Sequence, residues 1–112
     1  MDNRSEIPPG TLYMLILKTL ARRGAMHGYG IAQHIQQVSE YVLQVEEGSL
    51  YPALQRLLKA GLVKADWGVS ATNRKVRTYR LTPAGVKHLS VEVSSFEQML
   101  EGISLVLGLG EA

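Results

Sequence analysis

The chain has 112 residues, of which 46% are hydrophobic and 20% charged, with a formal net charge of +2 at pH 7, as in an ordinary globular domain. It contains no cysteine, which excludes disulfides, thiolate chemistry and cysteine-based zinc sites. The first ten residues lack the layout of a signal peptide, and the longest apolar run, LYMLIL at 12–17, is far shorter than the ~20 residues that cross a bilayer, so we expect a cytoplasmic protein without a membrane partner.

The first predicted element is a helix from about Pro9 to Arg23, with Pro9 in its early turn. Its apolar residues cover most of the helix circumference: Leu12, Tyr13, Met14, Leu15, Ile16, Leu17 and Leu20. A helix that is apolar on all sides must be covered on more than one side. In a small domain a second chain is the easiest cover, so this helix predicts a dimer.

Two further helices are predicted next. One covers roughly Tyr29 to Ser39, with Ile31, Ile35 and Val38 on its inner face. In the stretch GSLYPALQRLLKAGLV, at 48–63, Ser49 suits an N-cap, which places Pro52 at the third helical position, where a proline removes no hydrogen bond. Gly61 is the predicted stop. Two short helices in this order make a helix-turn-helix arrangement.

The third helix divides into two faces. Its apolar side consists of Leu50, Ala53, Leu54, Leu57 and Leu58. Tyr51, Gln55 and Lys59 run along the other side at i, i+4 and i+8, with Pro52 and Arg56 beside them. Amide and guanidinium groups suit base edges, and ammonium groups suit phosphates. The alternative is an ordinary amphipathic helix with a solvated face.

A basic hairpin is predicted downstream. Residues 50–90 hold eight basic side chains and one acidic one, whereas the flanking segments are net acidic. LVKADWGV and RKVRTYRLT read as strands joined by SATN, with Arg74, Lys75 and Arg77 at or just after the turn. Such a hairpin is a wing that contacts the DNA backbone or minor groove. A plain ribbon closing the core is the alternative, and it leaves the basic tip unexplained. Trp67, on the first strand, is expected to pack in the core or on the hairpin.

The last predicted helix begins with Thr82 as N-cap and Pro83 as first residue. Its apolar residues keep a heptad seam: Val86, Leu89, Val93, Phe96, Leu100, Ile103 and Leu107. A helix of ~25 residues reaches beyond so small a core. We therefore expect it to pair with the first and last helices of a second subunit, although packing within its own domain is the alternative for such a seam. A dimer presents two recognition helices and so predicts a two-fold-symmetric DNA site.

The blocks GTLYMLILKTLA, HGYGIAQHI, GSLYPALQRLLKAGLV and YRLTPAGVKHL, in this order around a basic hairpin, resemble the PadR family of bacterial transcriptional regulators, in its small-sized subgroup with a single C-terminal helix. The resemblance implies a mainly α-helical winged helix-turn-helix domain with a two-stranded wing at 1–82, a dimerisation helix at 83–112, and a dimeric repressor released by a small molecule. It carries DNA contacts over to Tyr29, Ser49, Tyr51, Pro52, Gln55, Arg56, Lys59, Arg74, Lys75 and Arg77.

The expected dimer also has a predicted interface and effector pocket. The predicted dimer interface consists of Leu12, Leu15, Ile16, Leu89, Val93, Phe96, Leu100, Ile103 and Leu107. A small hydrophobic effector is expected at that interface, in a pocket lined by Leu12, Met14, Phe96, Met99 and Leu100.

Enzymatic and metal sites are not expected. No two of the three histidines stand four apart, and no nucleophile–base pair or glycine-rich phosphate loop is visible, so we predict no enzyme, metal or cofactor. Two other functions stay open: a winged-helix module that binds an acidic protein, and a drug-sequestering protein without specific DNA binding. Affinity that falls steeply with salt on every DNA sequence distinguishes a DNA-binding protein from a module that binds an acidic protein.

Overall fold

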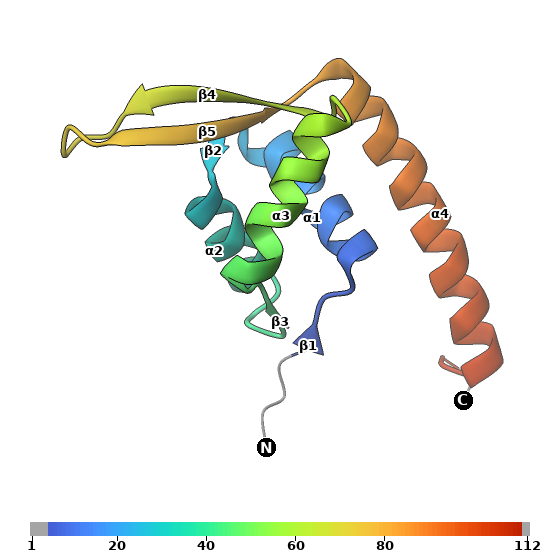
Figure 1. Ribbon diagram of the computed structural model, residues 1–112. Helices are drawn as coiled ribbons and strands as arrows, with labels where there is room; N and C mark the ends of the chain where they lie inside the picture. Colours follow the sequence, from blue (N-terminus) through green and yellow to red (C-terminus); the bar gives the residue numbers. More distant parts are fainter. Residues whose placement is uncertain (1–4, 111–112) are drawn as a thin grey trace.

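The computed structural model describes residues 5–110, with the side chains from Ile7 onward. The first four residues of the predicted region 1–82 and the last two residues of the predicted region 83–112 lie outside the described part. Within it, the chain forms a winged helix-turn-helix from which a long C-terminal helix extends (Figure 1). The elements in chain order are β1 (Ser5–Glu6), α1 (Pro9–Arg23), β2 (Met26–His27), α2 (Gly28–Val38), β3 (Leu43–Gln44), α3 (Glu47–Lys59), β4 (Val63–Val69), β5 (Lys75–Leu81) and α4 (Pro83–Leu107).

The wing is part of a three-stranded antiparallel sheet in the order β2-β5-β4. Strands β4 and β5 pair from Val63 opposite Leu81 out to Val69 opposite Lys75, as the sequence predicted. The third strand, β2, pairs Met26 with Tyr79 and was not predicted, because two residues are too short to show a period-two pattern. This strand joins the start of α2 to the base of the wing. A separate short parallel pair joins β1 to β3.

Helix α1 lies at the centre of the core, where it packs against α2, α3, α4 and β5. Ile16 and Leu17 are fully buried, and Leu12 and Leu20 nearly so. The helix is covered on more than one side, as predicted, but for these residues the cover comes from the subunit's own elements and not from a second chain. Among residues 5–110, no helix combines the length and the apolarity needed to cross a membrane.

The predicted inner face of α2 is confirmed in part. Ile31 and Ile35 are buried, but Val38 is 60% exposed because α2 ends there and the chain turns away. The helix begins after His27, whose Nδ1 accepts a 2.9 Å hydrogen bond from the Gly30 amide and so caps it.

Helix α3 begins earlier than predicted. Glu46, in an extended conformation, is the N-cap, and its carbonyl accepts a 2.9 Å bond from the Leu50 amide, so Ser49 lies inside the helix. The prediction that Pro52 sits in the first turn is therefore wrong: Pro52 is an interior residue. Lacking an N–H, it leaves the carbonyl of exposed Gly48 without its usual helical partner. The helix tolerates this because the carbonyl lies where water can reach it.

The end of α3 is fastened to the start of α4. Gly61, with a φ of 73°, stops α3 as predicted, and the Leu62 amide bonds back to the Leu57 carbonyl at 3.0 Å. Thr82 Oγ1 donates a 2.7 Å bond to the Gly61 carbonyl and accepts a 3.0 Å bond from the Gly85 amide, which caps α4 as predicted. The orientation of α4 is thereby tied to the C-terminus of α3.

Candidate DNA-binding surface

The outer face of α3 is the centre of the candidate surface. The inner side chains Leu50, Ala53, Leu54 and Leu57 are buried and Leu58 half-buried, as the helical periodicity predicted. Every predicted contact residue of this helix is exposed: Ser49, Tyr51, Pro52, Gln55, Arg56 and Lys59. The helix therefore presents hydroxyl, amide, guanidinium and ammonium groups to one side, which are the groups that read base edges and hold phosphates.

One flank of this face meets α1. The Arg56 Nη1 donates a 2.8 Å hydrogen bond to the hydroxyl of Tyr13, which lies 43 residues away in sequence. The two residues line a surface cavity of about 190 Å³ together with Ser49 and Pro52. Sequence reasoning assigned Tyr13 to an apolar helix side, because no local pattern reports a contact made across this distance in the chain.

The other flank meets the start of α2. Gly28 is buried against the ring of Tyr51, so closely that a Cβ there would lie 2.9 Å from Cε1 of the ring. The next residue, Tyr29, is 60% exposed, and its ring is stacked with His27 at a centroid separation of 6.5 Å. Tyr29 lies in the first turn of α2, and Tyr51 lies in the N-terminal half of α3, which packs against that turn through Gly28. The structure brings these two predicted contact residues into one region.

The wing tip is a tight loop. The Ser70 amide donates a 2.8 Å hydrogen bond to the Arg74 carbonyl. Asn73 has a left-handed φ of 62°, a conformation that asparagine adopts more readily than most residues. Arg74 and Lys75, at the end of this loop, are both exposed. Asn73 supplies the left-handed position that glycine often fills at such a turn.

Arg77 lies differently from the other predicted wing contacts. Its guanidinium carbon sits 5.7 Å from the ring centroids of both Trp67 and Tyr79, and Trp67 is its cross-strand partner. Its Nε is buried and finds no hydrogen-bond partner within the described residues. Arg77 is therefore a hairpin-packing cation rather than a cation at the tip. Trp67 is 68% exposed, so the core alternative is wrong, and the contact of its ring with Arg77 agrees with the expectation that it packs on the hairpin.

The only acidic side chain of residues 50–90 is already paired. Asp66 Oδ2 accepts a 3.0 Å bond from Arg80 Nε across the strands, and both side chains are about half exposed. Such an exposed pair contributes little to stability. Its effect here is to leave the wing without a free carboxylate that would repel a polyanion.

Comparison with known proteins decides the family. Residues 16–91, well over half of the chain, match the family model described as the transcriptional regulator PadR-like family. The chain belongs to the PadR family. Members of this family are DNA-binding transcriptional regulators and not enzymes, and this chain is therefore a DNA-binding transcriptional regulator.

Solved structures show the same PadR architecture. A transcriptional regulator from Clostridium thermocellum is 27% identical with a TM-score of 0.75, covering 92% of this chain and 95% of that one. A PadR-like regulator from Bacillus cereus is 25% identical with a TM-score of 0.74, covering 91% and 95%. An uncharacterised protein from Lysinibacillus sphaericus is 32% identical over 104 residues, covering 93% of this chain and 94% of its own length. The winged-helix fold with one C-terminal helix is thereby confirmed.

The α4 seam of this PadR regulator divides into a covered and an uncovered part. Leu89 is buried and Val93 half-buried against the core, whereas Val86 and the seam from Phe96 onward are exposed. In Figure 1 α4 runs away from the helix-turn-helix toward its C-terminal end. The distal apolar residues are Phe96, Met99, Leu100, Ile103, Leu105, Val106 and Leu107.

The predicted interface and effector pocket need corrections. Leu12, Ile16 and Leu89 are buried inside the subunit, so they have no surface to offer a second chain. Leu15 faces a cavity between α1 and α2. Three of the five predicted effector residues, Met14, Phe96 and Met99, line a cavity of about 280 Å³ between α1 and α4, but Leu12 and Leu100 do not. Leu12 instead lines cavities on the β1 side of α1.

Proposed function

We propose that this chain is a homodimeric transcriptional repressor that binds a two-fold-symmetric operator and is released from it by a small hydrophobic effector. In this proposal residues 1–82 bind DNA, residues 83–112 dimerise, and the protein acts in the cytoplasm, where bacterial chromosomes lie. The observation that carries the proposal is that the polar outer face of α3 is exposed, with Tyr51 packed against Gly28 at the start of α2, and that Arg74 and Lys75 at the wing tip are exposed as well.

The proposed DNA-binding residues have different roles. Gln55, on the exposed face of α3, and Arg56, at the edge of that face, suit adenine and guanine edges in the major groove. Lys59, Arg74 and Lys75 supply charge for phosphates. Tyr29, Ser49 and Tyr51 offer hydroxyl groups to the DNA backbone, and Pro52 offers a close apolar contact to it. Arg77 stabilises the conformation of the wing and does not contact DNA directly, because its guanidinium packs on the rings of Trp67 and Tyr79.

Dimerisation is supported by the uncovered half of α4. Phe96, Leu100 and Ile103 are each 41–51% exposed in one subunit, at heptad spacing. An exposed apolar stripe of this length marks an interface, because leaving it in water costs free energy that a partner helix recovers. Leu107 continues the stripe, and the proposed interface therefore consists of Val93, Phe96, Leu100, Ile103 and Leu107.

Effector release is supported by the cavity between α1 and α4. Its apolar wall contains Met14, Phe96 and Met99, and its position beside the proposed interface lets a ligand change how two subunits meet. Methionine side chains adapt their shape to different apolar ligands. Thr82 ties α4 to the end of α3, so a shift of α4 has a direct path to the recognition helix.

The proposal is tested by fluorescence anisotropy on a duplex from immediately upstream of the protein's own gene and on a scrambled duplex, at two salt concentrations. We expect tighter binding to the upstream duplex, with a preference that persists at the higher salt, and a reduced preference in Gln55→Ala. Equal and salt-sensitive binding to both duplexes would reject a specific repressor acting there. Salt-insensitive binding would favour instead a module that docks on a protein.

A further inference from the structure

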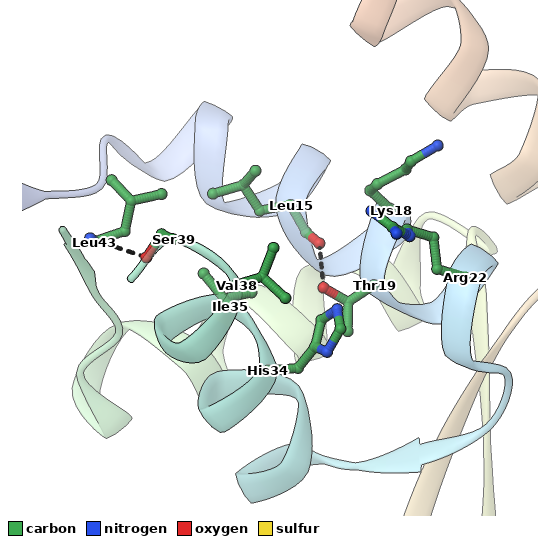
Figure 2. A pocket seen from close by; sticks show the side chains of 9 residues that line it. All are labelled: Leu15, Lys18, Thr19, Arg22, His34, Ile35, Val38, Ser39 and Leu43. Atoms are coloured by element: carbon green, nitrogen blue, oxygen red, sulfur yellow. Dashed lines mark hydrogen bonds between the residues drawn. The ribbon is translucent and has the colours of Figure 1, made fainter. Parts of the chain in front are cut away.

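A second cavity lies between α1 and α2, away from both the exposed face of α3 and the α1–α4 cavity. Its volume is about 140 Å³ (Figure 2). Leu15, Ile35, Val38 and Leu43 supply apolar walls from three segments of the chain. Val38, at 60% exposure, is the residue that sequence periodicity placed in the core and that instead borders this cavity. The walls are aliphatic, so the cavity suits a hydrocarbon body.

The charged side chains of the lining are both cations. Lys18 and Arg22 lie on the α1 side, and no acidic side chain lines the cavity. Figure 2 shows the His34 ring reaching from α2 toward α1. Partial burial, together with the charges of Arg23 and Arg22, lowers the pKa of His34. A ligand that carries negative charge is therefore favoured over a neutral or cationic one.

The two hydroxyl groups of the lining are already occupied. Thr19 Oγ1 donates a 2.8 Å bond to the Leu15 carbonyl, and Ser39 Oγ donates to the Gln36 carbonyl while accepting from the Leu43 amide, each at 3.1 Å. These groups hold the backbone and have little capacity left for a ligand. Polar recognition in this cavity must therefore come from the cations, and the remaining surface is hydrocarbon.

We propose that the α1–α2 cavity binds a small aliphatic carboxylate, with its carboxylate at Arg22 and its chain between Leu15, Ile35 and Val38. A cavity of about 150 Å³ accommodates a six-carbon hydrocarbon, so a body of about that size fits. An arginine recognises a carboxylate by charge-assisted hydrogen bonds that are often bidentate. This site is separate from the proposed effector cavity, and its occupancy does not depend on the proposed DNA-binding function.

The test is a titration of the full ¹⁵N-labelled chain with hexanoate, followed by amide chemical shifts, without DNA. We expect saturable shifts at Leu15, Ile35 and Val38. Hexanol, which lacks the charge, and acetate, which lacks the chain, should each bind more weakly. Arg22→Gln should weaken hexanoate binding about threefold to fivefold, as loss of one exposed ion pair does. Arg23→Gln removes the same charge one residue away, outside the lining, and should weaken it less.

A second variant tests the location directly. Val38→Trp fills the mouth of the cavity from an exposed position, so the fold should tolerate it while hexanoate binding is lost. Shifts centred on Met14, Phe96 and Met99 would place the ligand in the α1–α4 cavity and overturn the proposal. Equal binding of hexanol and hexanoate, equal effects of Arg22→Gln and Arg23→Gln, or the absence of saturable shifts in the folded chain would overturn it as well.

Discussion

The guanidinium of Arg56 on the recognition helix donates a 2.8 Å hydrogen bond to the hydroxyl of Tyr13 on α1. This bond holds a long side chain at one edge of the exposed face of α3. An arginine that is already ordered loses less conformational entropy when it meets a base than one that rotates freely. Tyr13 is therefore a positioning residue for the proposed DNA contact of Arg56.

Tyr13→Phe tests this relationship. The substitution removes only the hydroxyl, and we expect unfolding free energy to fall by no more than about 1 kcal/mol, the net worth of one exposed hydrogen bond. Binding to the specific duplex should weaken about threefold to tenfold, because Arg56 must then be ordered on binding. Anisotropy on specific and random duplexes measures both effects. Tyr41→Phe, at an exposed tyrosine outside α1 and α3, is the matched control. Equal losses on both duplexes would show that Tyr13 does not act through base recognition.

Gly85→Ala tests the junction of α3 and α4. A Cβ at this buried glycine would collide with the carbonyl oxygen of Leu62 and the side chain of Leu81. We expect a loss of about 1–3 kcal/mol in unfolding free energy, typical of overpacking, seen as a Tm lowered by several degrees. Gly102→Ala in the same helix, where a Cβ meets nothing within 4 Å, should raise stability by about 0.5–1 kcal/mol. A junction that tolerates both substitutions equally would not be closely packed.

Leu100→Glu tests the proposed dimer. The side chain is 51% exposed in one subunit, so the subunit should keep its fold and helicity while a charge enters the proposed seam. We expect a shift from dimer to monomer in sedimentation equilibrium and weaker binding to a two-fold-symmetric duplex. Val91→Glu places the same charge on an exposed position of α4 outside the seam and should leave the dimer intact. A monomeric parent protein, or a dimer that survives Leu100→Glu, would place the interface elsewhere.

Two neighbouring wing cations should behave differently. Lys75→Gln removes an exposed charge, so we expect all duplexes to be bound more weakly and the salt slope to fall by about 1. Arg77→Gln should instead change the fluorescence of Trp67, the only tryptophan, because the guanidinium over its ring is lost. The stability cost should be about 0.5–1 kcal/mol. Salt-dependence and emission spectra on both variants measure the difference, and an equal loss of salt slope would show that Arg77 reaches phosphate.

The local features of the sequence were sufficient where short-range chemistry decides the outcome. The bounds of α1, the stop at Gly61 and the cap at Thr82 were predicted correctly, because proline, glycine and threonine act on their own few residues of backbone. The N-cap of α3 was predicted wrongly at Ser49. Glu46 took that place because its backbone is extended and its carbonyl accepts the Leu50 amide, without any side-chain cap.

The sequence by itself determined that this is a winged helix-turn-helix regulator of the PadR family, since helix and strand periodicities and the order of motifs are local properties of the chain. Only the tertiary structure decided which apolar and charged residues are free to act. Ile16 is enclosed by its own subunit, Arg77 is held between two rings, and Arg56 is bonded to Tyr13. The physical reason is that burial and side-chain pairing depend on contacts between segments that are far apart in the chain. The spacing of side chains along one helix or strand gives no information about those contacts.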